Sequence, residues 1–322
     1  MQICAIEILS ITRLDELKTS DFPDLQQRLE NLKLFSDYYA AYARESFNDH
    51  SFIVHDNKNI QALVLVYEFE KRLMSPSDGV NIDVHSSIPK QVGMVYGMII
   101  KYLEKTLLEH RCKELLIKDT FCNGKLSQLG ELLFSKRYKA DISFEMSISY
   151  KNFNLENFYK NIRKSYKSLI NWGKKNITTV CINKDNPLKD KFIDFKNFHI
   201  KTSGRQTRSN ESWEIQYQKI VQGYGELILG YFEDKLVAGS LFLDHNSVSV
   251  YATGVYERSL DYGLSHYLTY LGVCRSYERG ITTSFSFGQF ETTVQDQKLY
   301  NIKFFKKGFC EEFIPTILWS KQ

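Results

Sequence analysis

Residues 226–256 decide the fold of this chain, and they read ELILGYFEDKLVAGSLFLDHNSVSVYATGVY. β-branched, leucine and aromatic residues gather in three runs, which is typical of strands. Glu233-Asp234 and His245-Asn246 separate the runs, and polar two-residue links of this kind join neighbouring antiparallel strands. The stretch therefore predicts a three-stranded β-meander, with strands at 226–232, 235–244 and 247–255.

The segments that follow the meander extend this pattern to a helix at 263–279, a strand at 283–287, a helix at 297–307 and a strand at 313–319. Residues 60–149 repeat the order, with a strand at 60–69, a helix at 91–110, a strand at 114–118, a helix at 126–136 and a strand at 142–149. A repeated order of elements indicates two similar units. We therefore expect an α/β (α+β) fold of two tandem domains, 1–152 and 153–322, each a mixed sheet flanked by helices.

A basic segment opens the second domain. Residues 151–176 hold seven Lys or Arg and one acid, within a chain of net charge +4. The periodicity predicts one helix over 155–175, and its cations suit a phosphate-bearing small-molecule partner. A solvated helix face explains the same charges equally well. A strand at 178–182 and two short helices at 188–201 and 212–222 precede the meander.

Several classes of protein are excluded by what the sequence lacks. The six cysteines have no C-x-x-C spacing, so we expect reduced thiols and no metal site. The longest apolar runs, such as 63–67, are far shorter than the roughly 20 residues that span a bilayer. The first residues do not resemble a signal peptide, and a cytoplasmic location is expected. H-E-x-x-H, G-x-S-x-G and Walker motifs are absent, which argues against metalloproteases, serine hydrolases and NTPases.

The ordered motifs of residues 155–320 resemble those of FemAB-like proteins, acyltransferases built from two GNAT-like domains. The resemblance rests on IRKSYK at 162–167, HIKTSGRQTRSNESW at 199–213, LVAGSLF at 236–242, YATGVY at 251–256, GLSH at 263–266, FG at 287–288 and FFKKGF at 304–309. Peptidoglycan-modifying members carry a long helical hairpin, whereas residues 188–223 leave room for a short one. The chain is therefore more similar to members that modify sugars or other small amines.

The resemblance implies transfer of an acyl or aminoacyl group to an amine, on an amino sugar or a cell-envelope precursor. Acyl-CoA and aminoacyl-tRNA are both candidate donors, and the short hairpin argues against a whole tRNA. A non-catalytic GNAT-like protein that binds a nucleotide-sugar or a partner is the alternative. A nucleic-acid binder is disfavoured, because the basic stripe is short and no binding motif accompanies it.

Candidate catalytic residues follow from the needs of acyl transfer, which are a proton acceptor, a polarised carbonyl and a proton for the leaving group. His199 and His266 are candidate bases, because histidine titrates near neutral pH. Tyr251 is a candidate proton donor. A buried structural role is the alternative for all three. We expect His199, Arg205 and Tyr251 to converge on one cleft.

Candidate binding residues are cations, an aromatic ring and strand-end or helix-end backbone groups. Substrate contacts are expected from Arg163, Lys164, Lys167, Arg205, Arg208, Trp213, Gly288, Glu291 and Lys306. The backbone of Gly263, Leu264 and Ser265 opens a helix and is the candidate site for a coenzyme pyrophosphate. A core position for Trp213 and a helix C-cap for Lys306 are the structural alternatives.

Overall fold

The computed structural model describes residues 9–17, 26–42, 47–56, 59–75, 79–85, 89–245, 247–260, 262–290 and 296–322. Its contacts divide the chain into two compact units. Unit 1 is Met1–Gln26, Ala43–Ser143 and Pro315–Gln322, and unit 2 is Gln27–Tyr42 and Phe144–Ile314. The units differ from the expected domains at three places, because residues 27–42 and 144–152 join unit 2 and the last eight residues join unit 1.

Unit 1 contains a four-stranded sheet and a set of shorter strands. The sheet has the order β1 (Ser10–Arg13), β3 (Phe52–His55), β4 (Ile60–Leu65) and β7 (Asn81–Val84). The second set has the order β8 (Glu114–Thr120), β6 (Arg72–Met74), β5 (Tyr67–Phe69) and β2 (Phe47–Asp49), and the end of β15 (Glu312–Lys321) pairs with β8. Helices α2 (Pro89–Glu109) and α3 (Gln128–Ser135) cover an apolar core.

The single strand predicted at 60–69 is wrong, because Val66 separates β4 from β5 and the two strands belong to different sheets. The backbone of Val66 is bonded outside both ladders. Its carbonyl accepts from the His50 N–H, and its N–H donates to the Ser51 hydroxyl. These two bonds take the chain from one sheet into the other.

The meander predicted in unit 2 is confirmed. The sheet has the order β10 (Thr178–Ile182), β11 (Gly225–Phe232), β12 (Lys235–His245), β13 (Val248–Tyr256), β14 (Ser284–Phe290) and β9 (Lys139–Ser149), of which residues 144–149 belong to unit 2. All neighbours are antiparallel except β13 and β14, which are parallel.

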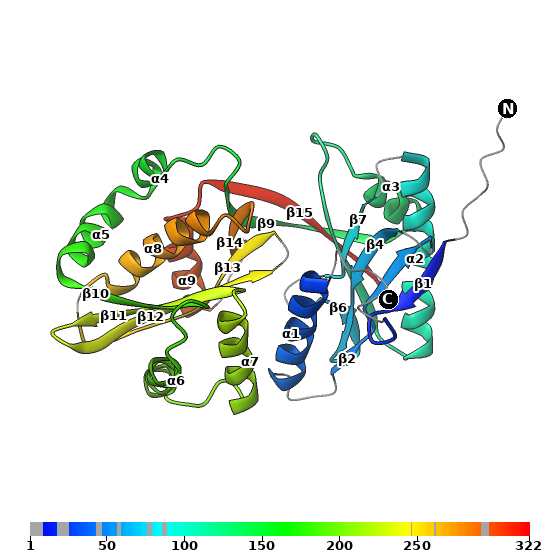
Figure 1. Ribbon diagram of the computed structural model, residues 1–322. Coiled ribbons are helices and arrows are strands. Elements are labelled where there is room, and N and C mark those ends of the chain that lie inside the picture. Colours follow the sequence, from blue (N-terminus) through cyan, green and yellow to red (C-terminus); the bar gives the residue numbers. More distant parts are fainter. Residues whose placement is uncertain are drawn as a thin grey trace. The chain divides into compact units, whose positions relative to one another are not determined.

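Helices cover both faces of this sheet, which explains why β11 is apolar at successive positions (Figure 1). Ile228 points to one face of the sheet. This face packs on α4 (Leu155–Asn161), α5 (Lys164–Asn176), α8 (Leu264–Arg279) and the C-terminal end of α9 (Gln297–Lys307). Leu227 and Leu229 point to the other, which packs on α6 (Lys189–Ser203) and α7 (Asn210–Val221). The alternation follows the two-residue period of a strand. We call these the α8 face and the α6 face.

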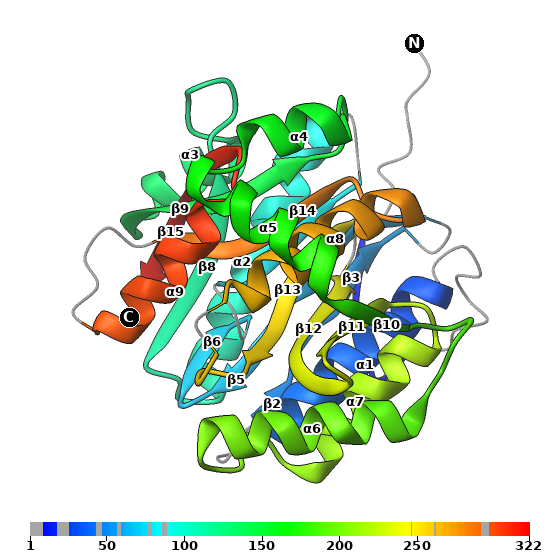
Figure 2. The same cartoon turned by 90° about the vertical axis from the view of Figure 1, so that its left-hand side faces the viewer.

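The helix predicted over 155–175 is two helices, because the chain breaks at Ile162 and Arg163. The backbone N–H of Arg163 donates to the Gly308 carbonyl at 2.9 Å instead of to a carbonyl one turn earlier. The break therefore links the start of α5 to the end of α9. Figure 2 shows α5 and α8 side by side in front of the sheet.

Helix α1 (Gln26–Tyr42) packs on unit 2, although the segments before and after it in the sequence belong to unit 1. Phe35 stacks on His245 with ring centroids 4.3 Å apart. The Tyr38 hydroxyl accepts from Arg208 Nε at 3.1 Å, and the Ser209 hydroxyl donates to the Ala41 carbonyl at 2.8 Å. These bonds attach α1 to the loop before α7.

Two partly exposed arginines bind two buried carboxylates and so anchor the C-terminal half of α8 to the sheet. Arg275 Nε donates to both carboxylate oxygens of Glu226, at 2.8 and 2.9 Å. Arg279 Nη2 donates to both oxygens of Asp244, at 2.8 and 3.0 Å, and the Ser249 hydroxyl donates to Asp244 at 2.6 Å. Burial raises the pKa of Asp244. Removing an arginine would leave a buried carboxylate without its cation, so this network fixes the position of α8.

We predict that Gly272→Ala destabilises unit 2, because an added Cβ on α8 would collide with the Phe242 ring of β12. Overpacking of this kind costs about 1–3 kcal/mol. Gly97→Ala in α2 is the matched control, since nothing lies within 4 Å of its added Cβ and alanine is the better helix former. Urea unfolding of both variants measures the difference, and equal midpoints would contradict the packing described.

Candidate functional site

The two parallel strands β13 and β14 separate after three residue pairs, the last of which is Val250 with Ser286. Beyond that pair β13 continues beside β12 and β14 continues beside β9. Tyr251 and Phe287 are the first residues past the last pair, and their ring centroids lie 6.5 Å apart. We call this place the β13–β14 divergence. Ligands of α/β proteins bind where neighbouring strands diverge in this way, at the carboxyl ends of the strands.

Gly288 lies at a bulge in β14, where the register with β9 shifts between Ser286 and Gly288. Its φ is +85°, in the left-handed region that favours glycine. Its N–H donates to the Ser286 hydroxyl at 3.0 Å. At this bulge the Phe287 carbonyl leaves the ladder and accepts a hydrogen bond from Lys306 Nζ at 2.8 Å.

Lys306, from α9, places its ammonium at the β13–β14 divergence. The Nζ atom lies 5.6 Å from the centroid of the Tyr251 ring. Burial lowers the pKa of Lys306 to about 8, and the charge of Lys303 adds to the effect. At neutral pH the group is therefore mostly cationic, yet its proton is exchangeable within the range in which acyl transfer operates.

The Tyr251 phenol has small polar neighbours, Ser240 and Thr269, on the α8 face. Burial raises the pKa of its phenol, and the Ser240 and Thr269 hydroxyls counter part of that rise. A Cβ on Gly254 would collide with the Tyr251 hydroxyl, so glycine is required there for this placement. Ser240 and Thr269 were missed by the sequence analysis. Their spacing carries no signal, and only the pairing of β12 with β13 and the packing of α8 bring them to Tyr251.

His266 and Arg163 lie on the same face as Tyr251. The His266 ring packs edge-on to Tyr166 and Phe305, with centroids 4.3 and 5.0 Å apart. Arg163 Nη1 donates to the Tyr166 hydroxyl at 3.0 Å, and its guanidinium covers the Phe304 ring at 3.9 Å. Burial lowers the pKa of His266 to about 4, so the ring is neutral and weakly basic at pH 7.

The start of α8 offers few free backbone donors. The Leu264 N–H donates to the Tyr262 carbonyl at 2.8 Å, and the His266 N–H donates to the Gly263 carbonyl at 3.0 Å. A Cβ on Gly263 would clash with Leu169 of α5, which closely covers this end of the helix. Of the three expected pyrophosphate ligands, Leu264 therefore has its N–H engaged, and Ser265 is half-buried.

His199, Trp213 and Arg208 form a separate cluster on the α6 face. The His199 ring lies 5.3 Å from Trp213, which is fully buried, and the Arg208 guanidinium lies 5.1 Å from the Trp213 ring. Arg208 Nη2 also donates to the Thr253 hydroxyl at 3.0 Å. Burial, and then the Arg208 charge, lower the pKa of His199 to about 4.

The expected convergence of His199, Arg205 and Tyr251 is therefore wrong. His199 and Tyr251 lie on opposite faces of the sheet, because they belong to helices and strands that pack into different cores. Arg205 is exposed in the turn after α6. The structure instead brings Arg163, Tyr251, His266, Gly288 and Lys306 to the α8 face.

Two further candidates, Lys164 and Lys167, lie on α5. Lys164 is exposed on α5. Lys167 Nζ donates to the Lys160 carbonyl at 2.8 Å and lies 5.8 Å from the Tyr159 ring. Glu291 lies outside the described residues. Phosphate binding by this basic stripe stays a prediction.

Comparison with solved structures identifies the fold. FemX aligns over 90% of this chain and 95% of its own, with 11% identity and a TM-score of 0.62. The C-terminal domain of a putative lysylphosphatidylglycerol synthetase from Agrobacterium fabrum aligns over 91% and 93%, with 9% identity and a TM-score of 0.60. A tandem GNAT protein from the clavulanic acid biosynthesis pathway aligns over 98% of both chains, with 9% identity and a TM-score of 0.51.

These likenesses define the class. The chain has the FemAB-like fold of two tandem GNAT-like units, as its sequence motifs predicted. No family model matches the chain, and no curated protein matches its sequence. Among the described helices, none is both long enough and apolar enough to cross a bilayer.

We predict that His199 makes stability depend on pH. Its pKa is about 4 in the folded chain and about 6.5 when unfolded, so between these values the unfolded state binds more protons. The contribution of neutral His199 to the free energy of unfolding is fully present above pH 6.5. It is lost as the pH falls towards 4, by up to about 1.4 kcal/mol per pH unit. His199→Gln should therefore reduce the slope of the free energy of unfolding against pH across that window, leaving the part that comes from His266. If the free energy of unfolding of this variant had the same slope against pH as that of the parent chain, the lowered pKa of His199 would be wrong.

Proposed function

We propose that this chain is an acyl- or aminoacyltransferase whose chemistry takes place at the β13–β14 divergence of unit 2. The observation that carries the proposal is the Lys306 ammonium, which lies beside Tyr251 and on the Phe287 carbonyl where the two strands separate. The FemAB-like fold supports it, since FemX and a putative lysylphosphatidylglycerol synthetase share that fold.

Lys306 and Tyr251 suit two different steps of acyl transfer. Attack of an amine on an ester or thioester carbonyl forms a tetrahedral intermediate with a negative oxygen. A cation in a desolvated site stabilises that oxygen more strongly than it would in water. The Lys306 ammonium supplies this charge. The attacking amine loses its proton to water, and either the Lys306 ammonium or the Tyr251 phenol gives a proton to the leaving oxygen or sulfur as its bond to the acyl carbon breaks.

The acceptor that we propose is an amine on a small molecule, with an amino sugar or a cell-envelope precursor as the substrate class. The donor is an acyl thioester or an aminoacyl ester. The start of α8 favours the ester, because one of its three candidate donors, the Leu264 N–H, is already bonded to the Tyr262 carbonyl and Leu169 closely covers Gly263. A coenzyme pyrophosphate bound to all three candidate donors would have to displace the Leu264 bond.

The direct test incubates the full chain with amino sugars and either acetyl-CoA or aminoacyl-tRNA, and measures acylated product by mass spectrometry. Product with either donor supports the proposal and identifies the donor class. Stabilisation by a nucleotide-sugar in a melting experiment, with no product from either donor, would instead indicate a non-catalytic binding protein.

We predict that Lys306→Met lowers turnover by about 10²–10⁴, because it removes the charge that faces the developing oxyanion. Lys307→Met is the matched control. Lys307 is the next residue of α9, is exposed, and lies near the Phe290 and Phe313 rings rather than Tyr251. Steady-state kinetics of both variants should show the loss in kcat only for Lys306→Met. Equal activities would remove Lys306 from the mechanism.

We also predict that turnover falls as the pH rises through about 8. Lys306 has a pKa of about 8, so it is protonated below that value and loses its charge above it. Lys306→Arg keeps the charge at all these pH values and should remove the alkaline fall from whatever activity remains. An alkaline limb that is unchanged in Lys306→Arg would assign it to another group.

A further inference from the structure

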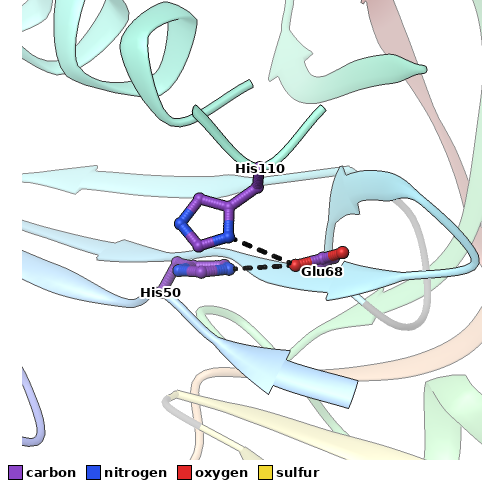
Figure 3. A group of neighbouring side chains, drawn as sticks. All are labelled: His50, Glu68 and His110. Carbon is purple, nitrogen blue, oxygen red and sulfur yellow. Dashed lines mark hydrogen bonds and ion pairs between the residues drawn. The ribbon is translucent and has the colours of Figure 1, made fainter. Parts of the chain in front are cut away.

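Two histidines and one carboxylate of unit 1 gather around a single point (Figure 3). His50 follows β2, Glu68 lies in β5, and His110 follows the last residue of α2. His50 Nε2 lies 3.5 Å and His110 Nδ1 lies 3.6 Å from the same oxygen, Oε2 of Glu68. The three atoms all lie within 4.8 Å of one another, and within the described ranges no other set of three or more such ligands comes as close.

These separations are longer than good hydrogen bonds and close to those of metal ligands. An N–H···O bond has its donor and acceptor about 2.7–3.2 Å apart, so neither histidine is well bonded to Glu68. Ligand atoms about 2.0–2.2 Å from a tetrahedral zinc ion lie about 3.4 Å from one another. The two measured separations of 3.5 and 3.6 Å correspond to two edges of such a tetrahedron.

The surroundings hold the cluster in this arrangement. The side chains of His50 and Glu68 are 5% and 3% exposed, whereas that of His110 is 41% exposed. Asn48 Nδ2 donates to Glu68 Oε2 at 3.1 Å, and Lys71 Nζ donates to Glu68 Oε1 at 2.9 Å. Lys71 thus orients the carboxylate from the oxygen that faces away from the histidines. Outer contacts of this kind fix ligating groups in metal sites.

We propose that unit 1 binds a Zn²⁺ ion through His50 Nε2, Glu68 Oε2 and His110 Nδ1, with a water molecule as the fourth ligand on the exposed side of His110. Imidazole and carboxylate together suit zinc, whereas Mg²⁺ requires an octahedral shell of oxygen atoms. The sequence analysis expected no metal site. The ligands are 18 and 42 residues apart and match no short motif, so only the fold reveals them.

Calorimetric titration of the full chain, freed of metal by a chelator, tests the proposal. We expect one equivalent of Zn²⁺ to bind and Mg²⁺ not to bind. His110→Ala should weaken Zn²⁺ binding by at least about 100-fold, since loss of even an outer contact weakens metal sites by about 10–100-fold. His110 is partly exposed, and circular dichroism would verify that its variant folds.

His85→Ala is the matched control, because His85 Nε2 also lies 3.5 Å from a carboxylate, that of Asp83, and belongs to no group of three ligands among the described residues. It should bind Zn²⁺ as tightly as the parent chain. Equal affinities for His110→Ala and the parent would overturn the proposal. Cys112 follows His110 by two residues, and its Sγ lies 4.0 Å from the His110 carbonyl. A Co²⁺ complex with a thiolate charge-transfer band that Cys112→Ser removes would also overturn the proposal, since the ligand set would then differ.

Discussion

The candidate site of unit 2 depends on one constraint, which is that β13 and β14 stay paired for only three residues. A bulge accompanies the separation on each side. The register of β12 with β13 shifts between Leu241 and Phe242, and that of β14 with β9 shifts between Ser286 and Gly288. Bulges bend and twist a strand, and two of them on opposite flanks turn the parallel pair apart. The Phe287 carbonyl, which no longer bonds across the pair, accepts from Lys306 Nζ and so holds the ammonium at the point where the strands separate.

The fold of unit 2 was predictable because its signals are local. The meander shows in three runs with two-residue links, and helix 297–307 shows in its spacing. The role of His199 could also have been predicted. His199 follows Phe195 by four residues and Phe192 by seven, which is one face of a helix, and both phenylalanines are buried. An apolar stripe of that kind indicates a core histidine rather than a base.

Other features could not be predicted because the partners are remote in sequence. Arg208 bonds to Tyr38, 170 residues earlier, and so α1 belongs to unit 2 rather than to the first half of the chain. The bulge that presents Phe287 to Lys306 involves a glycine that looks like any strand-end glycine. The ion network of Arg275 and Arg279 could not be predicted either, because its carboxylates come from two different strands. Long-range pairing decides these contacts, and no periodicity encodes it.

The choice of lysine over histidine at the site follows from desolvation. Burial lowers the pKa of His199, His266 and Lys306 by similar amounts, but from different starting values. The histidines reach about 4, where a base has little driving force at neutral pH. Lysine begins at 10.5 and reaches about 8, so it keeps its charge at pH 7 and can still exchange a proton. An apolar site that excludes water from an acyl intermediate would thus disable a histidine and activate a lysine.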